Sequence, residues 1–162
     1  MIKVCLDTTY LMPLFGLDTS IKNLKPQFLE LLEKNRYLFH YSPVSIIEIK
    51  WQIINLSTSR QKAEKFETQF SQALTALKAD KRFVVVDFLE ARINDFSFEL
   101  RKLGHTDYFD TVIAGSAVWE TKKFVTEDEP LKQVIQQYFQ TTVNSGLNEI
   151  EIISWDEFYS IG

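Results

Sequence analysis

The sequence contains little cysteine, glycine, proline and histidine: one, five, four and two residues among 162. The single cysteine, Cys5, has no partner within the chain, which excludes a secreted disulfide framework and predicts a reducing, cytoplasmic setting. Low glycine and proline contents exclude collagen-like and low-complexity classes. The two histidines, His40 and His105, make no recognised zinc spacing with Cys5, and we interpret both as ordinary structural or surface residues. Only His105 lies near Asp107 and Asp110 in the sequence.

Long apolar runs are also absent. Asp7 interrupts the N-terminal run too early for a signal-peptide core, and no later run approaches the length of a membrane span. We therefore expect a soluble protein without a membrane partner. The net charge of −4 offers no general attraction to nucleic acid. That objection weakens if the acids gather in one metal site, because bound divalent cations reverse the local field.

Phosphate-binding glycine loops are missing, which disfavours the nucleotide-loop folds. An aspartyl-phosphate enzyme would need a second acid two residues after Asp7, where Thr9 stands instead. Ser116 lacks the spacing of a nucleophile elbow. The sequence therefore offers no candidate for covalent catalysis.

Short apolar runs alternate with helical patterns along the chain. This alternation predicts a mostly parallel sheet with helices on both faces, in one domain spanning residues 1–162. We expect strands at 2–6, 37–41, 122–126 and in EIEIIS at 149–154, with a turn from residue 10. The run RFVVVD at 82–87 is either a short strand or an extended link. We expect helices at about 22–35, 43–55, 60–79, 88–102, 106–117 and 131–140.

Four acids occupy unusual settings. Asp7 follows the first strand, where it is equally well explained as a helix cap or as a ligand at the strand's carboxyl end. Asp128 repeats the arrangement in FVTED, and two such strand ends are less expected by chance. Glu48 lies in the apolar helix SPVSIIEIKW, in which Val44, Ile47, Trp51 and Ile54 share a face. Asp110 lies among apolar and small residues, and an unpaired buried carboxylate costs several kcal/mol.

The helix in TDYFDTVIAGSA places Asp107 and Asp110 on one face. Because Phe109, Val112, Ile113 and Trp119 take the opposite side, we expect little of this helix to face water. Asp107 is either a further ligand or a cap at the helix start. Gly115 costs roughly 1 kcal/mol relative to alanine within a helix, so we expect another segment to pass close to it.

A cluster of carboxylates without histidine or cysteine selects hard cations, Mg²⁺ or Mn²⁺. The four segments, LDTTYL, SPVSIIEIKW, DTVIAGSA and FVTED, together resemble the PIN-domain nucleases in order and spacing over nearly the whole chain. The resemblance implies a three-layer α/β/α fold and metal-dependent endonuclease cleavage of RNA. It further implies similarity to VapC-type toxins, which are usually dimeric and are silenced by a cognate antitoxin protein.

On this reading Asp7, Asp110 and Asp128 hold the cation, and Glu48 completes the cluster or orients the attacking water. Thr126, Thr9 and Asp107 are secondary candidates for contacts with the ligands or with water; Thr9 stands where the family often has asparagine, serine or aspartate. Four basic side chains are candidate phosphate contacts, although a solvated surface position explains each of them better: Arg92, Arg101, Lys122 and Lys123. The alternative function is a catalytically silent PIN-like module that binds RNA or protein.

Overall fold

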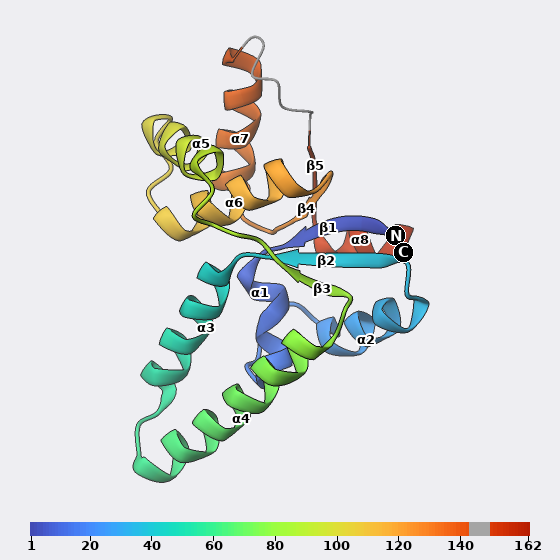
Figure 1. Ribbon diagram of the computed structural model, residues 1–162, viewed down its shortest axis with the longest axis vertical. Helices are drawn as coiled ribbons and strands as arrows, with labels where there is room; N and C mark the ends of the chain where they lie inside the picture. Colours follow the sequence, from blue (N-terminus) through green and yellow to red (C-terminus); the bar gives the residue numbers. More distant parts are fainter. Residues whose placement is uncertain (143–149) are drawn as a thin grey trace.

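Five parallel strands form one sheet in the order β3-β2-β1-β4-β5 in a computed structural model, which describes residues 1–142 and 150–162 (Figure 1). The strands are β1 Ile2–Leu6, β2 Tyr37–Tyr41, β3 Phe83–Val85, β4 Lys123–Val125 and β5 Glu151–Ile153. All four pairings are parallel, as the alternation of strands and helices predicts. Glu149, at the start of the EIEIIS run, lies outside the described residues.

The strand β1 lies at the centre of the sheet because the chain changes direction there. It passes from β1 outward to β2 and β3 on one side, and then returns to place β4 and β5 on the other. Leu6 of β1 is in register with Val125 of β4, so the residues that follow these two strands emerge side by side. In open parallel sheets such a reversal opens a crevice at the carboxyl ends of the strands, where ligands bind.

Helices cover both faces of the sheet. Side chains of α1, α2, α3, α4 and α8 pack on one face, and those of α5, α6 and α7 pack on the other. The helices are α1 Thr8–Leu11, the 3-10 helix η1 Met12–Phe15, α2 Leu24–Lys34, α3 Pro43–Leu56, α4 Arg60–Ala79, α5 Ala91–Lys102, α6 Tyr108–Glu120, α7 Glu129–Thr141 and α8 Trp155–Ile161. The predicted α/β architecture with helices on both sides of a parallel sheet is confirmed.

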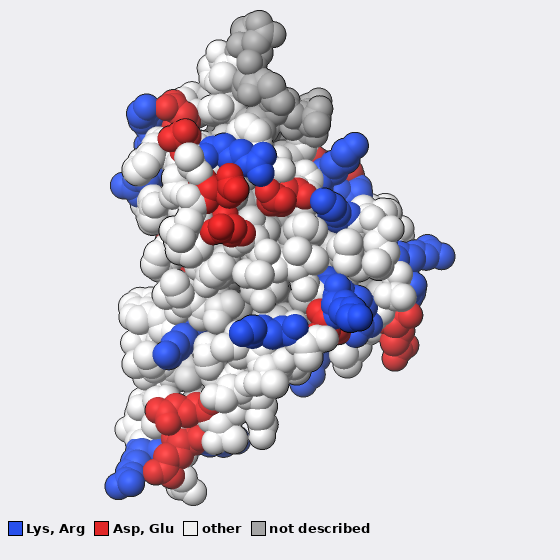
Figure 2. All heavy atoms as spheres, in the orientation of Figure 1, with Lys and Arg blue, Asp and Glu red and all other residues white. Residues whose placement is uncertain are grey.

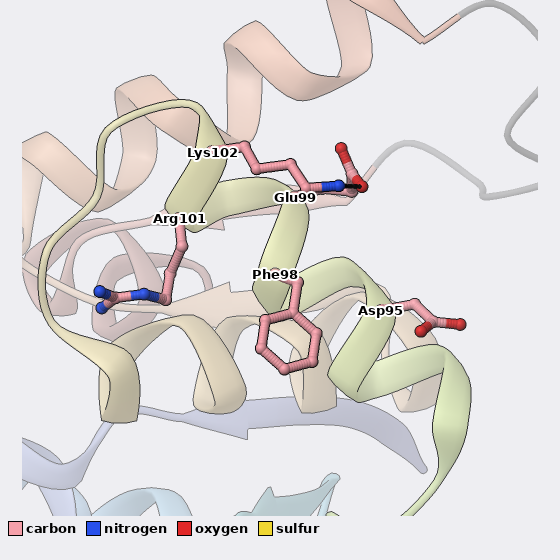
Figure 3. Close-up of a pocket in the computed structure, with 5 residues that line it drawn as sticks. All are labelled: Asp95, Phe98, Glu99, Arg101 and Lys102. Carbon is pink, nitrogen blue, oxygen red and sulfur yellow. Dashed lines mark hydrogen bonds and ion pairs between the residues drawn. The ribbon is translucent and has the colours of Figure 1, made fainter.

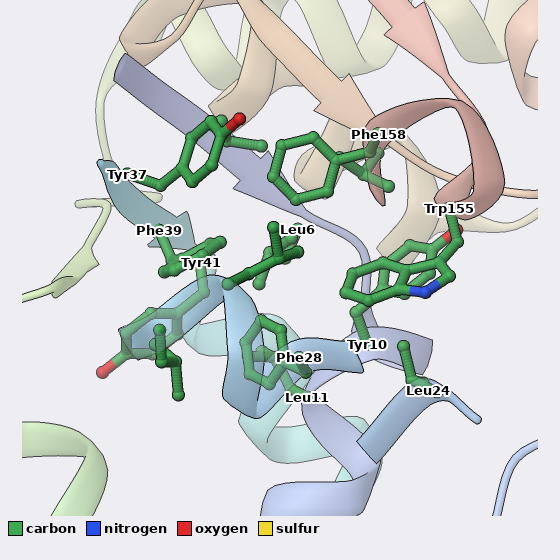
Figure 4. Close-up of a cluster of buried hydrophobic side chains, with 14 of the residues drawn as sticks. Leu6, Tyr10, Leu11, Leu24, Phe28, Tyr37, Phe39, Tyr41, Trp155 and Phe158 are labelled. Atoms are coloured by element: carbon green, nitrogen blue, oxygen red, sulfur yellow. The ribbon is translucent and has the colours of Figure 1, made fainter. Parts of the chain in front are cut away.

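The larger core is aromatic (Figure 4). Phe28 of α2 packs edge-on against Phe39 of β2 with ring centroids 5.2 Å apart, and Trp155 of α8 stacks on Tyr10 of α1 at the same separation. Aromatic pairs of this kind add about 0.5–1.5 kcal/mol beyond the burial of their area. These contacts fix α1, which follows Asp7, against the sheet.

Two local predictions differ from the structure. The turn expected from residue 10 is the helix α1 followed by η1, because the Asp7 side chain caps a helix that begins at Thr8. The final helix α8 was not predicted, since its short sequence WDEFYSI has little periodicity. Ser154 and Glu157 start it with a capping box, in which each side chain accepts from the other's backbone N–H.

Gly115 lies where α6 crosses α5. A Cβ atom at this position would lie 2.8 Å from the Ile93 carbonyl oxygen and 3.0 Å from Ile93 Cγ2. The close neighbour expected from a glycine within a helix is therefore the backbone of α5. A buried hydrogen bond of 2.7 Å between the hydroxyls of Ser97 and Thr111 joins the same two helices.

The apolar face of α3 is largely uncovered. Ile47, Trp51 and Ile54, which share one face, are 53%, 65% and 59% exposed. The opposite side of α3 supplies the core contacts through Ile49 and Ile53. Within the described residues, this helix therefore carries two apolar faces, and the chain itself covers only one.

Candidate metal centre

Asp7 and Thr126 lie at the carboxyl ends of adjacent strands. The Asp7 backbone N–H donates to the Val125 carbonyl at 3.2 Å, which extends the pairing of β1 with β4 by one residue. The Thr126 hydroxyl donates to Asp7 Oδ2 at 2.6 Å, and the Thr8 backbone N–H donates to Asp7 Oδ1, also at 2.6 Å. Both oxygens of Asp7 are thereby fixed in direction. The two interpretations of Asp7 are compatible, because it caps α1 and also faces the crevice.

Glu48 projects from α3 toward the same point. Ser42 caps this helix by accepting from the Val44 N–H, and Pro43 occupies its first turn, as expected. The Thr8 hydroxyl donates a short hydrogen bond to Glu48 Oε2. Adjacent residues, Asp7 and Thr8, therefore connect the end of β1 to an acid that is forty positions away.

Asp107 and Asp110 have different roles in α6. Asp107 is the N-cap, and its Oδ1 accepts from the backbone N–H groups of Phe109 at 2.9 Å and Asp110 at 3.4 Å. Asp110 is only 24% exposed and points into the crevice with the other acids. The helix is less covered than predicted, because Tyr108 and Phe109 are each 40% exposed. The two aromatic residues at the start of α6 are therefore partly open to solvent, whereas the residues from Thr111 to Val118 are buried.

Asp128 and His105 lie close to Asp110. Asp128 caps α7 by accepting from the Leu131 N–H at 2.8 Å. One ligand atom each from His105, Asp110 and Asp128 lies within 4.8 Å of the others. His105, interpreted from the sequence as an ordinary structural or surface residue, is buried, and its Nε2 lies 3.4 Å from Asp110 Oδ2. Its place five residues before Asp110 was the sequence signal that put it near the site.

The acids line one open cavity of about 200 Å³. Its wall consists of Asp7, Thr8, Thr9, Met12, Glu48, Gln52, Asp110, Glu127 and Asp128. The structure thus brings together the four predicted acids and Thr9, while Thr126 contacts the cavity through Asp7. Glu127 was not predicted. Its Oε1 accepts from the Trp155 N–H at 2.8 Å and from the Tyr10 hydroxyl at 3.2 Å, so it also ties α8 and α1 to the cavity.

Burial and mutual repulsion change how these acids titrate. Burial, followed by the charges of Asp7, Asp107, Asp128 and Glu48, raises the pKa of Asp110 to about 8. Burial is also the main reason why the pKa values of Asp7 and Glu48 are raised, and neighbouring acids add to the effect. A cation among these carboxylates would relieve the repulsion. The donor set therefore fits a hard or borderline divalent ion.

The four candidate phosphate contacts differ in their distance from the acidic cavity. Lys122 and Lys123 lie at the start of β4, which is the opposite end of the strands from the acids. Arg92 pairs with Glu120 at the far end of α6, on the order of 15 Å along the helix from Asp110. None of these three lies at the cavity. Only Arg101 lies near the start of α6, the end that carries Asp110, because its guanidinium donates to the Thr106 carbonyl at 2.6 Å.

Two other features of the structure offer no alternative functional site. A hollow on α5 is lined by Asp95, Phe98, Glu99, Arg101 and Lys102, all from one helix, and its Lys102 is paired with Glu99 at 2.6 Å (Figure 3). The Cys5 thiol is fully buried, and burial raises its pKa well above the usual range. No helix in the described part of the chain is long and apolar enough to cross a membrane.

Comparison with known protein families and with curated proteins gives no match. Solved structures do match. VapBC2 from Rickettsia felis, bound to a DNA fragment from its promoter, aligns with a TM-score of 0.60 and 21% identity over 96% of this chain and 100% of the matched chain. FitAcB from Neisseria gonorrhoeae aligns with a TM-score of 0.62 and 14% identity over 93% and 96%. DNA-bound VapBC from Salmonella typhimurium aligns with 0.57 and 17% over 96% and 99%. At these identities the likeness shows the fold, which is PIN-like.

Proposed function

We propose that this protein is a metal-dependent endoribonuclease that hydrolyses RNA phosphodiester bonds, and that it is the toxin of a type II toxin–antitoxin pair. One observation carries the enzymatic part. Asp7, Glu48, Asp110 and Asp128 come from four separate parts of the chain and line a single cavity at the reversal point of the sheet. Acids that served only stability would not be expected to converge and raise one another's pKa values.

Mg²⁺ or Mn²⁺, held by Asp7, Asp110 and Asp128, would supply an activated water and neutralise charge on the phosphate. The protein side chains do the rest. Thr126 and Thr8 orient the two Asp7 oxygens, while the caps formed by Asp107 and Asp128 fix the starts of α6 and α7. Glu48, held by Thr8 through Oε2, orients the attacking water.

The charge distribution fits an RNA substrate only if a cation is bound. The net charge is −4, and on the face seen in Figure 2 basic side chains lie among acidic ones without forming a continuous basic surface. A phosphate group would therefore be drawn to the acidic cavity by the cation. Arg101 of α5 lies beside the start of α6, and it is the basic side chain that we propose for contact with the RNA backbone.

The uncovered face of α3 supports a protein partner. Ile47, Trp51 and Ile54 form an apolar stripe beside Glu48 and Gln52, and such stripes usually mark an interface. The resemblance of the sequence to VapC-type toxins implies an antitoxin as this partner, and the similar solved structures include VapBC2 and VapBC. We propose that an antitoxin covers this face in the cytoplasm. We also propose that the protein forms a homodimer. The mass of the purified protein in solution would test the homodimer.

The enzymatic proposal is tested by incubating purified protein with structured and unstructured RNA, with Mg²⁺, Mn²⁺ or a chelator. Cleavage is expected only with the cation. A thermal-shift titration with Mn²⁺ on the same preparation reports binding, because a ligand that binds only the folded state raises the melting temperature. Binding of Mn²⁺ and RNA without cleavage would favour the alternative, a catalytically silent module. No thermal shift and no cleavage would reject the metal centre.

A further inference from the structure

His105 is held rigidly at the end of α5. Its backbone N–H donates to the Leu100 carbonyl at 3.2 Å, and the Gly104 N–H donates to the Arg101 carbonyl at 3.0 Å. Gly104 has a φ of +107°, and these two bonds form the Schellman arrangement that ends many helices. His105 itself is 8% exposed. These two bonds set the position of the His105 backbone, and the side chain that it carries is buried.

The ring faces the metal centre. His105 Nε2 lies 3.4 Å from Asp110 Oδ2, and ligand atoms of His105, Asp110 and Asp128 lie within 4.8 Å of one another. Opposite ligands of a six-coordinate ion are about 4.2 Å apart when each bond is about 2.1 Å. The three groups therefore span nearly the space that one ion requires.

We propose that His105 is a metal ligand, so that the centre is a mixed imidazole and carboxylate site that selects Mn²⁺ over Mg²⁺. This inference rests on the proposed metal-dependent function and specifies its cation. Mg²⁺ binds oxygen ligands almost exclusively, whereas first-row transition metals accept imidazole nitrogen as well. A purely structural histidine would instead hold Asp110 in place and leave cation selectivity unchanged.

The test is electron spin echo envelope modulation of Mn²⁺ bound to the protein, which detects nitrogen-14 in a coordinated imidazole. The protein must carry no histidine tag. The chain has only two histidines, and His40 lies in β2, so a nitrogen signal is assigned by comparing His105→Gln with His40→Gln. We expect modulation in the wild type and in His40→Gln, and its loss in His105→Gln. His105→Gln should also weaken Mn²⁺ binding by at least about 10-fold and leave Mg²⁺ binding within about twofold.

The wild-type and His40→Gln spectra together decide the question even if His105→Gln fails to fold. Bound Mn²⁺ without nitrogen modulation, or modulation that survives in His105→Gln, would overturn the ligand assignment and leave the nuclease proposal intact. Nitrogen modulation in a protein that cleaves no RNA would do the reverse, supporting the ligand and rejecting the nuclease. A wild-type protein that binds Mg²⁺ but no Mn²⁺ would overturn the ligand assignment alone, and one that binds neither cation would overturn both.

Discussion

The Thr126 hydroxyl donates to Asp7 Oδ2 at 2.6 Å and accepts from the Asp128 backbone N–H at 3.1 Å. One fully buried side chain therefore connects the acids that follow β1 and β4. This connection explains why a hydroxyl precedes the acid in FVTED. In the proposed metal centre it would orient a ligand rather than bind the cation itself, which is how residues behind a metal ligand commonly act.

Thr126→Val should weaken Mn²⁺ binding by about 10–100-fold, because Asp7 loses the donor that fixes its direction. Valine has nearly the shape of threonine, so the packing around β4 is conserved. Thr126→Ser is the matched control, and it should bind Mn²⁺ within a few-fold of the wild type. Isothermal titration calorimetry measures both affinities. Equal affinity in a folded Thr126→Val protein would show that this hydroxyl does not position Asp7.

Without a cation, the protein should lose stability as pH rises from 7 to 9. The pKa of Asp110 is raised from 3.8 to about 8, so the folded state keeps a proton that the unfolded state has already released. The resulting stabilisation is complete below pH 3.8 and is lost as pH rises through 8. The pKa of His40 is lowered by burial to about 4, so His40 is neutral throughout this range and does not interfere.

Melting temperatures in a chelating buffer, measured at several pH values between 7 and 9, test this expectation. The wild type should melt at lower temperature as pH rises, and Asp110→Asn should show a much smaller change. Added Mn²⁺ should reduce the slope in the wild type. Parallel slopes in the two proteins would mean that Asp110 is not the group that titrates.

Gly115→Ala should destabilise the protein despite the better helix propensity of alanine. The new methyl group would lie 2.8 Å from the Ile93 carbonyl oxygen, which belongs to backbone and cannot rotate away. Overpacking of this kind costs about 1–3 kcal/mol, against a gain of about 1 kcal/mol from propensity. Urea denaturation measures the difference. A more stable Gly115→Ala protein would show that α5 and α6 separate easily.

Trp51→Ser should leave the free energy of unfolding within about 0.5 kcal/mol of the wild type, since the indole is 65% exposed. The same substitution should weaken binding of a co-expressed antitoxin, which we expect to cover α3. Leu29→Ser, at an exposed position of α2, is a matched control that should leave the affinity unchanged. Both affinities can be measured by calorimetry. Unchanged binding in Trp51→Ser would place the partner elsewhere.

The sheet and the acids were predictable from the sequence because both leave local signals. A short apolar run that ends at an acid, as at Asp7 and Asp128, reports a strand and its carboxyl end. Glu127 was not predictable, because its partners Tyr10 and Trp155 come from distant segments. The place of His105 near the acids was visible in the sequence, five residues before Asp110, but the direction of its ring was not. The orientation of α3 was ambiguous for a physical reason. A helix that is apolar on two faces does not reveal which one its own chain covers.

The measurement that tests the account most directly is the rate of RNA cleavage as a function of free Mn²⁺ concentration, for the wild type, Asp7→Asn and Asp110→Asn. We predict that the wild-type rate saturates at the concentration at which calorimetry shows the site to be filled. Each variant should be slower by at least about 100-fold, since each removes a ligand from the cavity. Cleavage that persists in both variants, or that does not depend on the cation, would contradict the proposed site.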